Sequence, residues 1–328
     1  MSLRFALVAA LGLFACDSNA SNGADTSDTN NNDTTDTTDT ADTNDGSDTA
    51  DSSDTADSSD TADSSDTSDT ADTTPGGPIA AVPGARCKLS ERIGLIEVEA
   101  QGPSTVYLNG SVSDRPNPYY GEPELADAAC AFHRFNPQGA CAPCDEDELC
   151  GIDGVCVKSP VRRTDTRVVV DHGGQTTELA ANGETGEIFG ELASDPQTYA
   201  LTLHVGDQRI TLGATTVPGA LNASGTLSGD SMDPKGVTTT WAAQAGDSQV
   251  YTRISINHHA AGPTFTECHV PASSGTLSIA GTMLKPLAVV TGLEFQGLEH
   301  QRVAAAETAA GCIEFRFFYK EFTSLTEQ

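Results

Sequence analysis

The chain has 328 residues and a formal net charge of -30 at pH 7, from 47 acidic and 17 basic side chains. The charge is unevenly distributed, because residues 17–76 hold 17 Asp and no Lys, Arg or Glu. That leaves 30 acidic and 16 basic residues in 77–328, the part with enough apolar side chains to form a core. Binding to a phosphate backbone needs clustered Lys and Arg, so we do not expect nucleic acid as a partner.

The first fifteen residues predict a signal peptide. A short basic start, Met1 to Arg4, precedes an apolar run from Phe5 to Ala15 that is shorter than the ~20 residues of a transmembrane helix. The run ends in Leu-Phe-Ala-Cys, which resembles the bacterial lipobox, with Phe14 in place of the usual small residue. We therefore expect cleavage before Cys16 and lipidation of Cys16. The alternative is an ordinary secretory signal in which Cys16 has no role.

Cysteine arithmetic favours lipidation. Nine Cys would leave an odd thiol in an oxidising compartment, whereas a lipid on Cys16 leaves eight for disulfides. The disulfide candidates are Cys87, Cys130, Cys141, Cys144, Cys150, Cys156, Cys268 and Cys312.

Residues 16–76 predict a disordered acidic tether. Asp recurs at every third position from Asp33 to Asp72, and the hexamer Asp-Thr-Ala-Asp-Ser-Ser repeats unchanged from Asp48 to Ser65. With few apolar groups and uniform charge, nothing offsets the entropy of ordering this backbone. We interpret the stretch as a spacer. Calcium binding is the alternative, although Asp42 to Asp48 has Gly46 where an EF-hand ligand should stand.

Residues 77–160 predict a Cys-rich segment with short strands. Alternating apolar residues predict strands at Ile93–Ala100 and Thr105–Val112. A Pro-rich stretch, 116–123, follows and carries Tyr119 and Tyr120, which are candidate contact residues for a ligand.

Four of the cysteines form a dense cluster with the pattern Cys141-x2-Cys144-x5-Cys150-x5-Cys156. We expect local disulfides within this set and a bond between Cys87 and Cys130, although fifteen pairings of the six are possible. Four thiolates could instead bind zinc, and Cys141-x-x-Cys144 could be a redox pair. Export to an oxidising compartment favours disulfides over both.

Residues 161–328 predict a β-sandwich-like domain, because short alternating segments are separated by Gly, Asp, Asn and Pro. Thr198–Val205 should form a hairpin through Gly206 and Asp207. A second hairpin is expected between the strand around Trp241, a core residue, and Gln249–Ile256. The last strand, Ile313–Tyr319, places apolar and charged residues on opposite faces, and we expect a Cys268–Cys312 disulfide. The predicted fold class is thus mainly β: a disulfide-stapled, β-sandwich-like domain after a Cys-rich segment and a tether.

No catalytic, cofactor-binding or metal-binding residue can be assigned from a motif. Gly246-Asp247-Ser248 matches the start of an esterase motif but is better explained as a turn. His258, His259 and His269 could bind a metal, but no carboxylate at metalloenzyme spacing accompanies them. We therefore expect no enzyme and no cofactor, and keep a secreted hydrolase or metal-dependent enzyme at these histidines as the alternative.

The lipobox, the Asp/Thr/Ser tether, the Cys-x2-Cys-x5-Cys-x5-Cys cluster and the β-rich end together resemble exported lipoproteins of myxobacteria and related Gram-negative bacteria. This resemblance implies a lipid-anchored protein of the cell envelope, at the outer membrane or cell surface. Its partners would be the membrane, through the Cys16 lipid, and an unidentified protein or glycan. We expect a binding or structural role, and a passive spacer would have no site at all.

Overall fold

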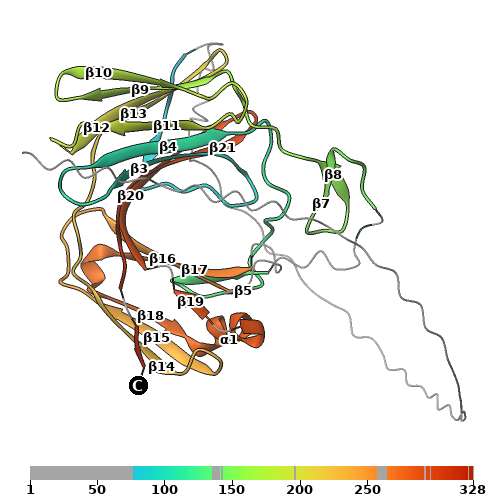
Figure 1. Cartoon of the computed structure of the whole chain (residues 1–328), viewed down its shortest axis with the longest axis vertical. Coiled ribbons are helices and arrows are strands. Elements are labelled where there is room, and N and C mark those ends of the chain that lie inside the picture. Colours follow the sequence, from blue (N-terminus) through green and yellow to red (C-terminus); the bar gives the residue numbers. More distant parts are fainter. Residues whose placement is uncertain are drawn as a thin grey trace, which may run out of the picture. The chain divides into compact units, whose positions relative to one another are not determined.

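The structure is a computed structural model that describes residues 77–134, 141, 143–195, 197–256, 264–291, 293–295, 297–323 and 325–327 (Figure 1). The predicted signal peptide, Cys16 and the acidic tether lie outside the described residues. His258 and His259 do so as well. The described part contains one α-helix, α1 (Gly281–Thr291), and a short 3-10 helix (Ala272–Ser274), and is otherwise built from strands. The prediction of a mainly β fold is confirmed.

A sheet of eleven strands forms the centre of the fold. Its strands follow the order β11 (Ile188–Leu192), β4 (Val106–Val112), β3 (Arg92–Ala100), β21 (Gly311–Glu321), β20 (Leu298–Thr308), β16 (Gln249–Ile256), β17 (Phe265–Pro271), β6 (Cys130–His133) and β5 (Leu125–Ala126), with β19 (Leu293–Phe295) beside β16 and β2 (Val82–Pro83) beside β20.

Three smaller sheets complete the fold. The five-stranded sheet has the order β1 (Ile79–Ala80), β13 (Gln208–Thr216), β12 (Thr198–Val205), β9 (Thr166–His172) and β10 (Gln175–Ala180). The four-stranded sheet has the order β18 (Thr276–Ala280), β15 (Pro234–Thr240), β14 (Ser224–Gly229) and β22 (Leu325–Glu327). The two-stranded sheet consists of β7 (Glu148–Cys150) and β8 (Cys156–Lys158).

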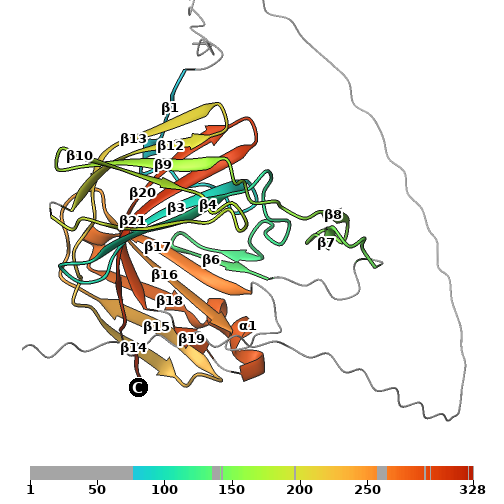
Figure 2. The ribbon, with the colours of Figure 1, turned by 45° about the horizontal axis from the view of Figure 1, so that its top comes forward.

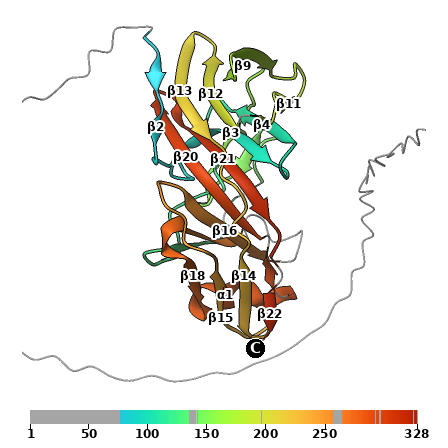
Figure 3. The same ribbon diagram turned by 90° about the vertical axis from the view of Figure 1, so that its left-hand side faces the viewer.

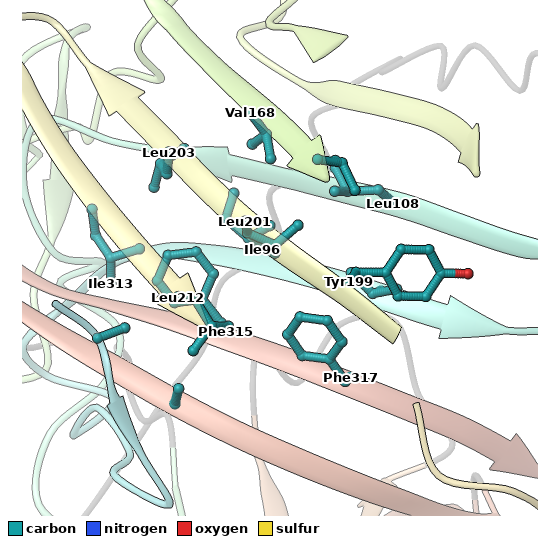
Figure 4. Close-up of a cluster of buried hydrophobic side chains, with 14 of the residues drawn as sticks. Ile96, Leu108, Val168, Tyr199, Leu201, Leu203, Leu212, Ile313, Phe315 and Phe317 are labelled. Carbon is teal, nitrogen blue, oxygen red and sulfur yellow. The ribbon is translucent and has the colours of Figure 1, made fainter. Parts of the chain in front are cut away.

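Two hydrophobic cores lie on the same face of the central sheet, which we call the outer face. In the first core, alternate residues of β3, β4, β20 and β21 pack against the five-stranded sheet, with Phe315 and Phe317 among the fully buried side chains (Figure 4). In the second, side chains of β6, β16 and β17 pack against the four-stranded sheet and α1. Trp241 belongs to this second core, as predicted, and its indole N–H donates to the Ala272 carbonyl at 2.8 Å.

Strand β20 spans both cores, because Leu298 lies in the second and Ala304 and Ala306 in the first. Figure 3 shows β20 and β21 running together between these two parts of the molecule. In Figures 1 and 2 the strands β3 and β4 lie above β16 and β17, with the five-stranded sheet above the former and the four-stranded sheet below the latter. The opposite, inner face of the central sheet therefore lies between its two halves.

The structure joins regions that the sequence analysis divided at residue 160. Strand β3, from the predicted Cys-rich segment, lies between β4 and β21 and pairs in parallel with β21, the last long strand of the chain. The expected hairpin from Thr198 is confirmed by the antiparallel pairing of β12 with β13. The second hairpin is wrong, because β15 ends at Thr240 and pairs with β14 and β18, while β16 belongs to the central sheet.

The disulfides correct two of the expected pairings. Cys87 bonds to Cys312 and Cys130 bonds to Cys268, so the expected Cys87–Cys130 and Cys268–Cys312 bonds are wrong. The reason is register: Cys130 and Cys268 are directly opposite on β6 and β17, whereas Cys312 begins β21 beside the segment that carries Cys87. Within the dense cluster, Cys141 bonds to Cys150 and Cys144 to Cys156, so the expected local pairing is confirmed.

Candidate functional site: a polar groove on the inner face

The inner face is polar because it carries the residues that alternate with those of the two cores. Directly opposite residues of neighbouring strands lie on the same face, so the register places Phe189, Asn109, Glu97 and Arg316 in one row across four strands. A second row, Glu299, Tyr251 and His269, crosses β20, β16 and β17. Each strand thus contributes apolar residues to one face and charged or aromatic residues to the other.

Three cavities on this face share lining residues and form one continuous path, which we call the inner groove. The outermost, of about 310 Å³, is lined by Leu95, Glu97, Asn109 and Phe189 among others. It shares Leu95 and Glu97 with a middle cavity of about 200 Å³. The middle cavity shares Arg92, Glu267 and Arg316 with a third cavity of about 190 Å³ at the other end of the path from Phe189, which we call the innermost cavity.

The inner groove shows that the face is concave. Glu97 of β3 and Glu267 of β17 line the same middle cavity, although three strands separate β3 from β17 in the sheet. In a flat sheet, strands four positions apart would lie about 19 Å from each other, at ~4.8 Å per position. The sheet is bent around the groove, and its cores are on the outside of the bend.

Glu314 and Arg316 anchor the floor of the groove. Arg316 Nε donates to Glu314 Oε1 at 2.6 Å, and Arg92 Nη1 lies 3.5 Å from the same oxygen. The other carboxylate oxygen, Oε2, accepts the backbone N–H of Cys87 at 3.0 Å, which ties the segment before β3 to the sheet. Burial opposes ionisation of Glu314, but Arg316 and Arg92 hold the pKa of that carboxyl below its usual value. Buried charges of this kind are stable only when fully paired.

A second cluster, formed by His133, Glu267 and His269, lies at the innermost cavity. His133 Nε2 is 3.4 Å from Glu267 Oε1, and His269 Nε2 is 3.9 Å from Glu267 Oε2. Burial opposes ionisation of Glu267, but the adjacent imidazoles hold its pKa at about 2. Burial also lowers the pKa of His269 to about 3, so this imidazole is neutral at pH 7.

Aromatic rings hold the imidazole and guanidinium groups in place. His133 stacks on Phe265 and His269 on Tyr251, with ring centroids 5.0 and 4.8 Å apart. The guanidinium carbon of Arg253 lies 3.8 Å from the centroid of Phe265. Such contacts fix the planes of the polar groups, so that they face the groove in defined orientations.

The pKa values of two further carboxyl groups on this face are shifted in the opposite direction to those of Glu267 and Glu314. Burial raises the pKa of Glu97 and of Glu299 above the usual value. One oxygen of Glu299 is buried without a hydrogen-bond partner in the described residues. The groove therefore contains carboxyl groups whose pKa values are shifted in both directions.

The outer end of the groove carries an aromatic platform. Phe189 is 68 % exposed and stacks on Tyr107, with centroids 5.7 Å apart and ring planes inclined by 18°. Phe189 lines the outermost cavity beside the polar side chains of Asn109 and Glu97. An exposed aromatic ring next to hydrogen-bonding groups suits a ligand that has both apolar and hydroxyl-bearing faces.

The candidate contact residues from the sequence are both described, and one of them borders the groove. Tyr120 lines the middle cavity and packs edge-on against Phe265, with centroids 6.1 Å apart. Tyr119 lies next to it but does not line the described cavities, and its backbone N–H donates to Asn117. His269 lines the innermost cavity, whereas His258 and His259 lie outside the described residues.

The remaining candidates from the sequence lie outside the groove. The sulfur atoms of Cys141, Cys144 and Cys156 lie within 4.8 Å of one another, a spacing compatible with a metal, but each is bonded in a disulfide. Ser248, from the esterase-like tripeptide, is buried and hydrogen-bonds to His300 Nε2 at 2.9 Å. The other ring nitrogen of His300, Nδ1, lies 2.7 Å from the Gly219 carbonyl oxygen. The described contacts of Ser248 and His300 therefore join strand β20 to two loop segments and do not face the groove.

Apart from Tyr120 and His269, sequence reasoning missed the residues that line the groove. It placed Glu314 and Arg316 on the polar face of the last strand, but could not show that strands β3, β16 and β17 bring their own charged residues against that face. A signal was present in the alternation of charged and apolar residues along Glu97–Glu99, Arg253 and Glu314–Arg316. A polar face of this kind is also typical of a solvent-exposed sheet.

Comparisons with known proteins do not identify the chain. No family model and no curated protein matches it. Among solved structures, it is similar to a tetra-tandem repeat in the extending region of a large adhesion protein, at 12% identity and a TM-score of 0.16. The match covers 70% of this chain and 49% of that chain, and a TM-score this low does not establish a shared fold. In the described part of the chain, no helix has the length and apolar character needed to span a membrane.

Proposed function

We propose that this protein is an exported, lipid-anchored envelope protein that binds an oligosaccharide in the inner groove. The observation that carries the proposal is the groove itself: three joined cavities lined by planar polar side chains, with an exposed phenylalanine at the outer end. Binding sites for drug-like apolar molecules are mostly lined by apolar groups. This groove instead combines carboxylate, guanidinium, imidazole and amide groups with apolar and aromatic surface, a combination that suits a chain of sugars, which has hydroxyl groups and apolar ring faces.

The elongated shape of the groove supports a chain rather than a single small molecule. Cavities of about 310, 200 and 190 Å³ follow one another from Phe189 to the innermost histidines. Phe189 and Tyr120 border the outermost and the middle cavity, where each could stack against a sugar ring. The lipobox at Cys16 and the acidic tether support display of this domain at the envelope, away from the membrane.

The binding proposal is tested by calorimetric titration of the full chain with neutral and acidic trisaccharides. We expect at least one to bind, and Phe189→Ala to weaken its binding by about tenfold, the loss of a ~1.4 kcal/mol contact. Phe322→Ala is the matched control, because Phe322 is 84 % exposed and does not line the groove. Equal effects of the two substitutions, or no binding to any of the sugars, would contradict the proposal.

The envelope part of the proposal has its own test. The intact mass of the membrane-extracted protein should show loss of residues 1–15 and a lipid adduct on Cys16. A mass without the adduct, or retention of residues 1–15, would contradict lipid anchoring without affecting the groove.

Hydrolysis of the bound sugar is the second candidate function. Glycosidases use one protonated and one ionised carboxyl group, and the groove contains carboxyl groups with raised pKa values, Glu97 and Glu299, and with lowered ones, Glu267 and Glu314. New reducing ends in the titration mixture, lost in Glu299→Gln, would establish hydrolysis in place of binding alone.

A further inference from the structure

Most charged groups of the inner groove already have a partner of opposite charge. Glu314 is paired with Arg92 and Arg316, and Arg316 also lies 3.8 Å from Glu97. Lys88, at the rim, pairs with Glu91 at 3.4 Å. These pairs stabilise the groove and leave little charge for a ligand.

Arg86 is an exception. It lines the innermost cavity, and its Nε and Nη2 atoms donate to the neutral side-chain oxygen of Gln249 at 3.1 and 2.8 Å. Among the described residues, no carboxylate oxygen lies within 4.0 Å of its guanidinium nitrogens. Burial lowers the pKa of Arg86 to about 10, and the attraction of Glu314 and Glu267, which acts in the opposite direction, offsets only part of this desolvation.

Arg253 is a second exception, in the middle cavity. It is directly opposite Glu267 on β16 and β17, but its guanidinium lies over the Phe265 ring instead of pairing with that carboxylate. Its Nε is buried and has no hydrogen-bond partner in the described part of the chain. Two adjoining cavities thus each contain a half-buried guanidinium without a described carboxylate partner.

From this arrangement we infer that the inner groove is specific for acidic oligosaccharides, with the carboxylates of uronic acid residues bound by Arg86 and Arg253. The inference rests on the proposed oligosaccharide binding and names the class of sugar. A guanidinium binds a carboxylate through two parallel hydrogen bonds, and this contact would offset the cost of burying each arginine. The nearby carboxylates do not occupy these two guanidinium groups, since Glu314 pairs with Arg92 and Arg316, and Glu267 lies beside His133 and His269.

The experiment compares uronic acid trisaccharides, of galacturonate and of mannuronate, with their methyl esters, which retain the hydroxyl groups and the size but lose the charge. Calorimetric titration of the full chain should show that an acid binds at least about tenfold more tightly than its ester. Arg86→Gln and Arg253→Gln should each reduce this ratio, and together bring it close to one. Arg209→Gln, at an exposed position of β13, is the matched control and should leave the ratio unchanged.

The ester also reports on the integrity of the groove. If the double variant still binds the ester as the unaltered protein does, the loss of preference for the acid is due to the missing guanidinium groups. Equal binding of acid and ester to the unaltered protein, or an acid preference that survives the double substitution, would overturn the inference and leave oligosaccharide binding in place. No binding of acid, ester or neutral sugar would overturn both.

Inorganic sulfate, added as a third arm, should not compete at the concentration of the sugar, and competition would show a site for free anions instead.

Discussion

The two faces of the central sheet are formed by alternate residues of the same strands, yet they differ in what holds them together. The outer face is apolar and is covered by two further sheets and a helix. The inner face carries arginine, glutamate and histidine in ordered pairs and bends around a groove. Packing on the outer face therefore stabilises the fold, whereas the burial of charged groups on the inner face costs part of that free energy.

A long-range disulfide helps to hold the segment that borders the innermost cavity. Cys87–Cys312 fastens the segment that carries Arg86 to the start of β21, and closes a loop of 225 residues. Replacing both cysteines by serine should lower the free energy of unfolding by ~5 kcal/mol, from the entropy of closing so long a loop. Replacing Cys141 and Cys150, which are 9 residues apart, should cost ~3 kcal/mol or less. Guanidinium unfolding of the two double variants checks this order, and a larger loss for the short loop would contradict it.

A single side chain of the outer face should have the next largest effect. Phe315 is completely buried in the first core, and Phe315→Ala should lower the free energy of unfolding by ~3–5 kcal/mol through lost burial and a residual cavity. Phe322→Ala removes the same atoms from an exposed position and should change it by no more than ~0.5 kcal/mol. Similar losses in urea unfolding of the two variants would show that the outer face does not dominate stability.

The outer face could be predicted from the sequence, because burial there follows the alternation of side chains. Ile313, Phe315 and Phe317 repeat at every second position, and the same pattern predicted the strands at residues 93–100 and 105–112 and the hairpin from Thr198. Cysteine spacing likewise predicted local bonds in the cluster from Cys141 to Cys156. Each of these features depends on residues that are close in the chain.

The inner groove could not be predicted, because it depends on pairing between distant strands. Glu97 and Arg316 are in contact because β3 lies in parallel beside β21, and nothing in either segment specifies the other. The same reason explains why the predicted pairings of Cys87 and Cys268 were wrong. The observed disulfides join cysteines that are neighbours in the folded structure, whereas the prediction joined cysteines that are neighbours in the chain. Arg86 lies outside any strand, so no alternation of side chains could predict that it faces the groove.

Acid should destabilise the inner face through His269. The pKa of His269 is about 3 in the folded protein, against 6.5 for an unperturbed imidazole. Between these values the unfolded chain binds a proton that the folded chain does not, so stability falls as the pH falls, by up to ~1.4 kcal/mol per pH unit. Glu267 acts in the same direction, but below pH 4.5, whereas the raised pKa values of Glu97 and Glu299 act in the opposite direction.

His269→Gln isolates the contribution of the imidazole. Between pH 6.5 and 4.5 the urea midpoint of the unaltered protein should fall relative to that of the variant, because only the former must exclude a proton from this position. Parallel pH profiles of the two proteins would show that His269 is not held neutral by burial.

Within the inner face, the smallest expected effect on stability is at the outer end of the groove, where the face meets solvent. Phe189→Ala should change the free energy of unfolding by less than ~1 kcal/mol, because the ring is exposed and loses only its stack on Tyr107. Its effect on binding should differ in kind from that of Arg86→Gln. Loss of the ring should weaken binding of the acid and of its methyl ester by the same factor, since the ring does not interact with the charge of the ligand. Arg86→Gln should weaken binding of the acid alone. If Phe189→Ala left the binding of both sugars unaltered, the platform would not be part of the site, and recognition would be confined to the charged groups farther along the groove. If it changed the preference for the acid, the ring would contribute to the recognition of charge, contrary to the expected division between the platform and the arginines.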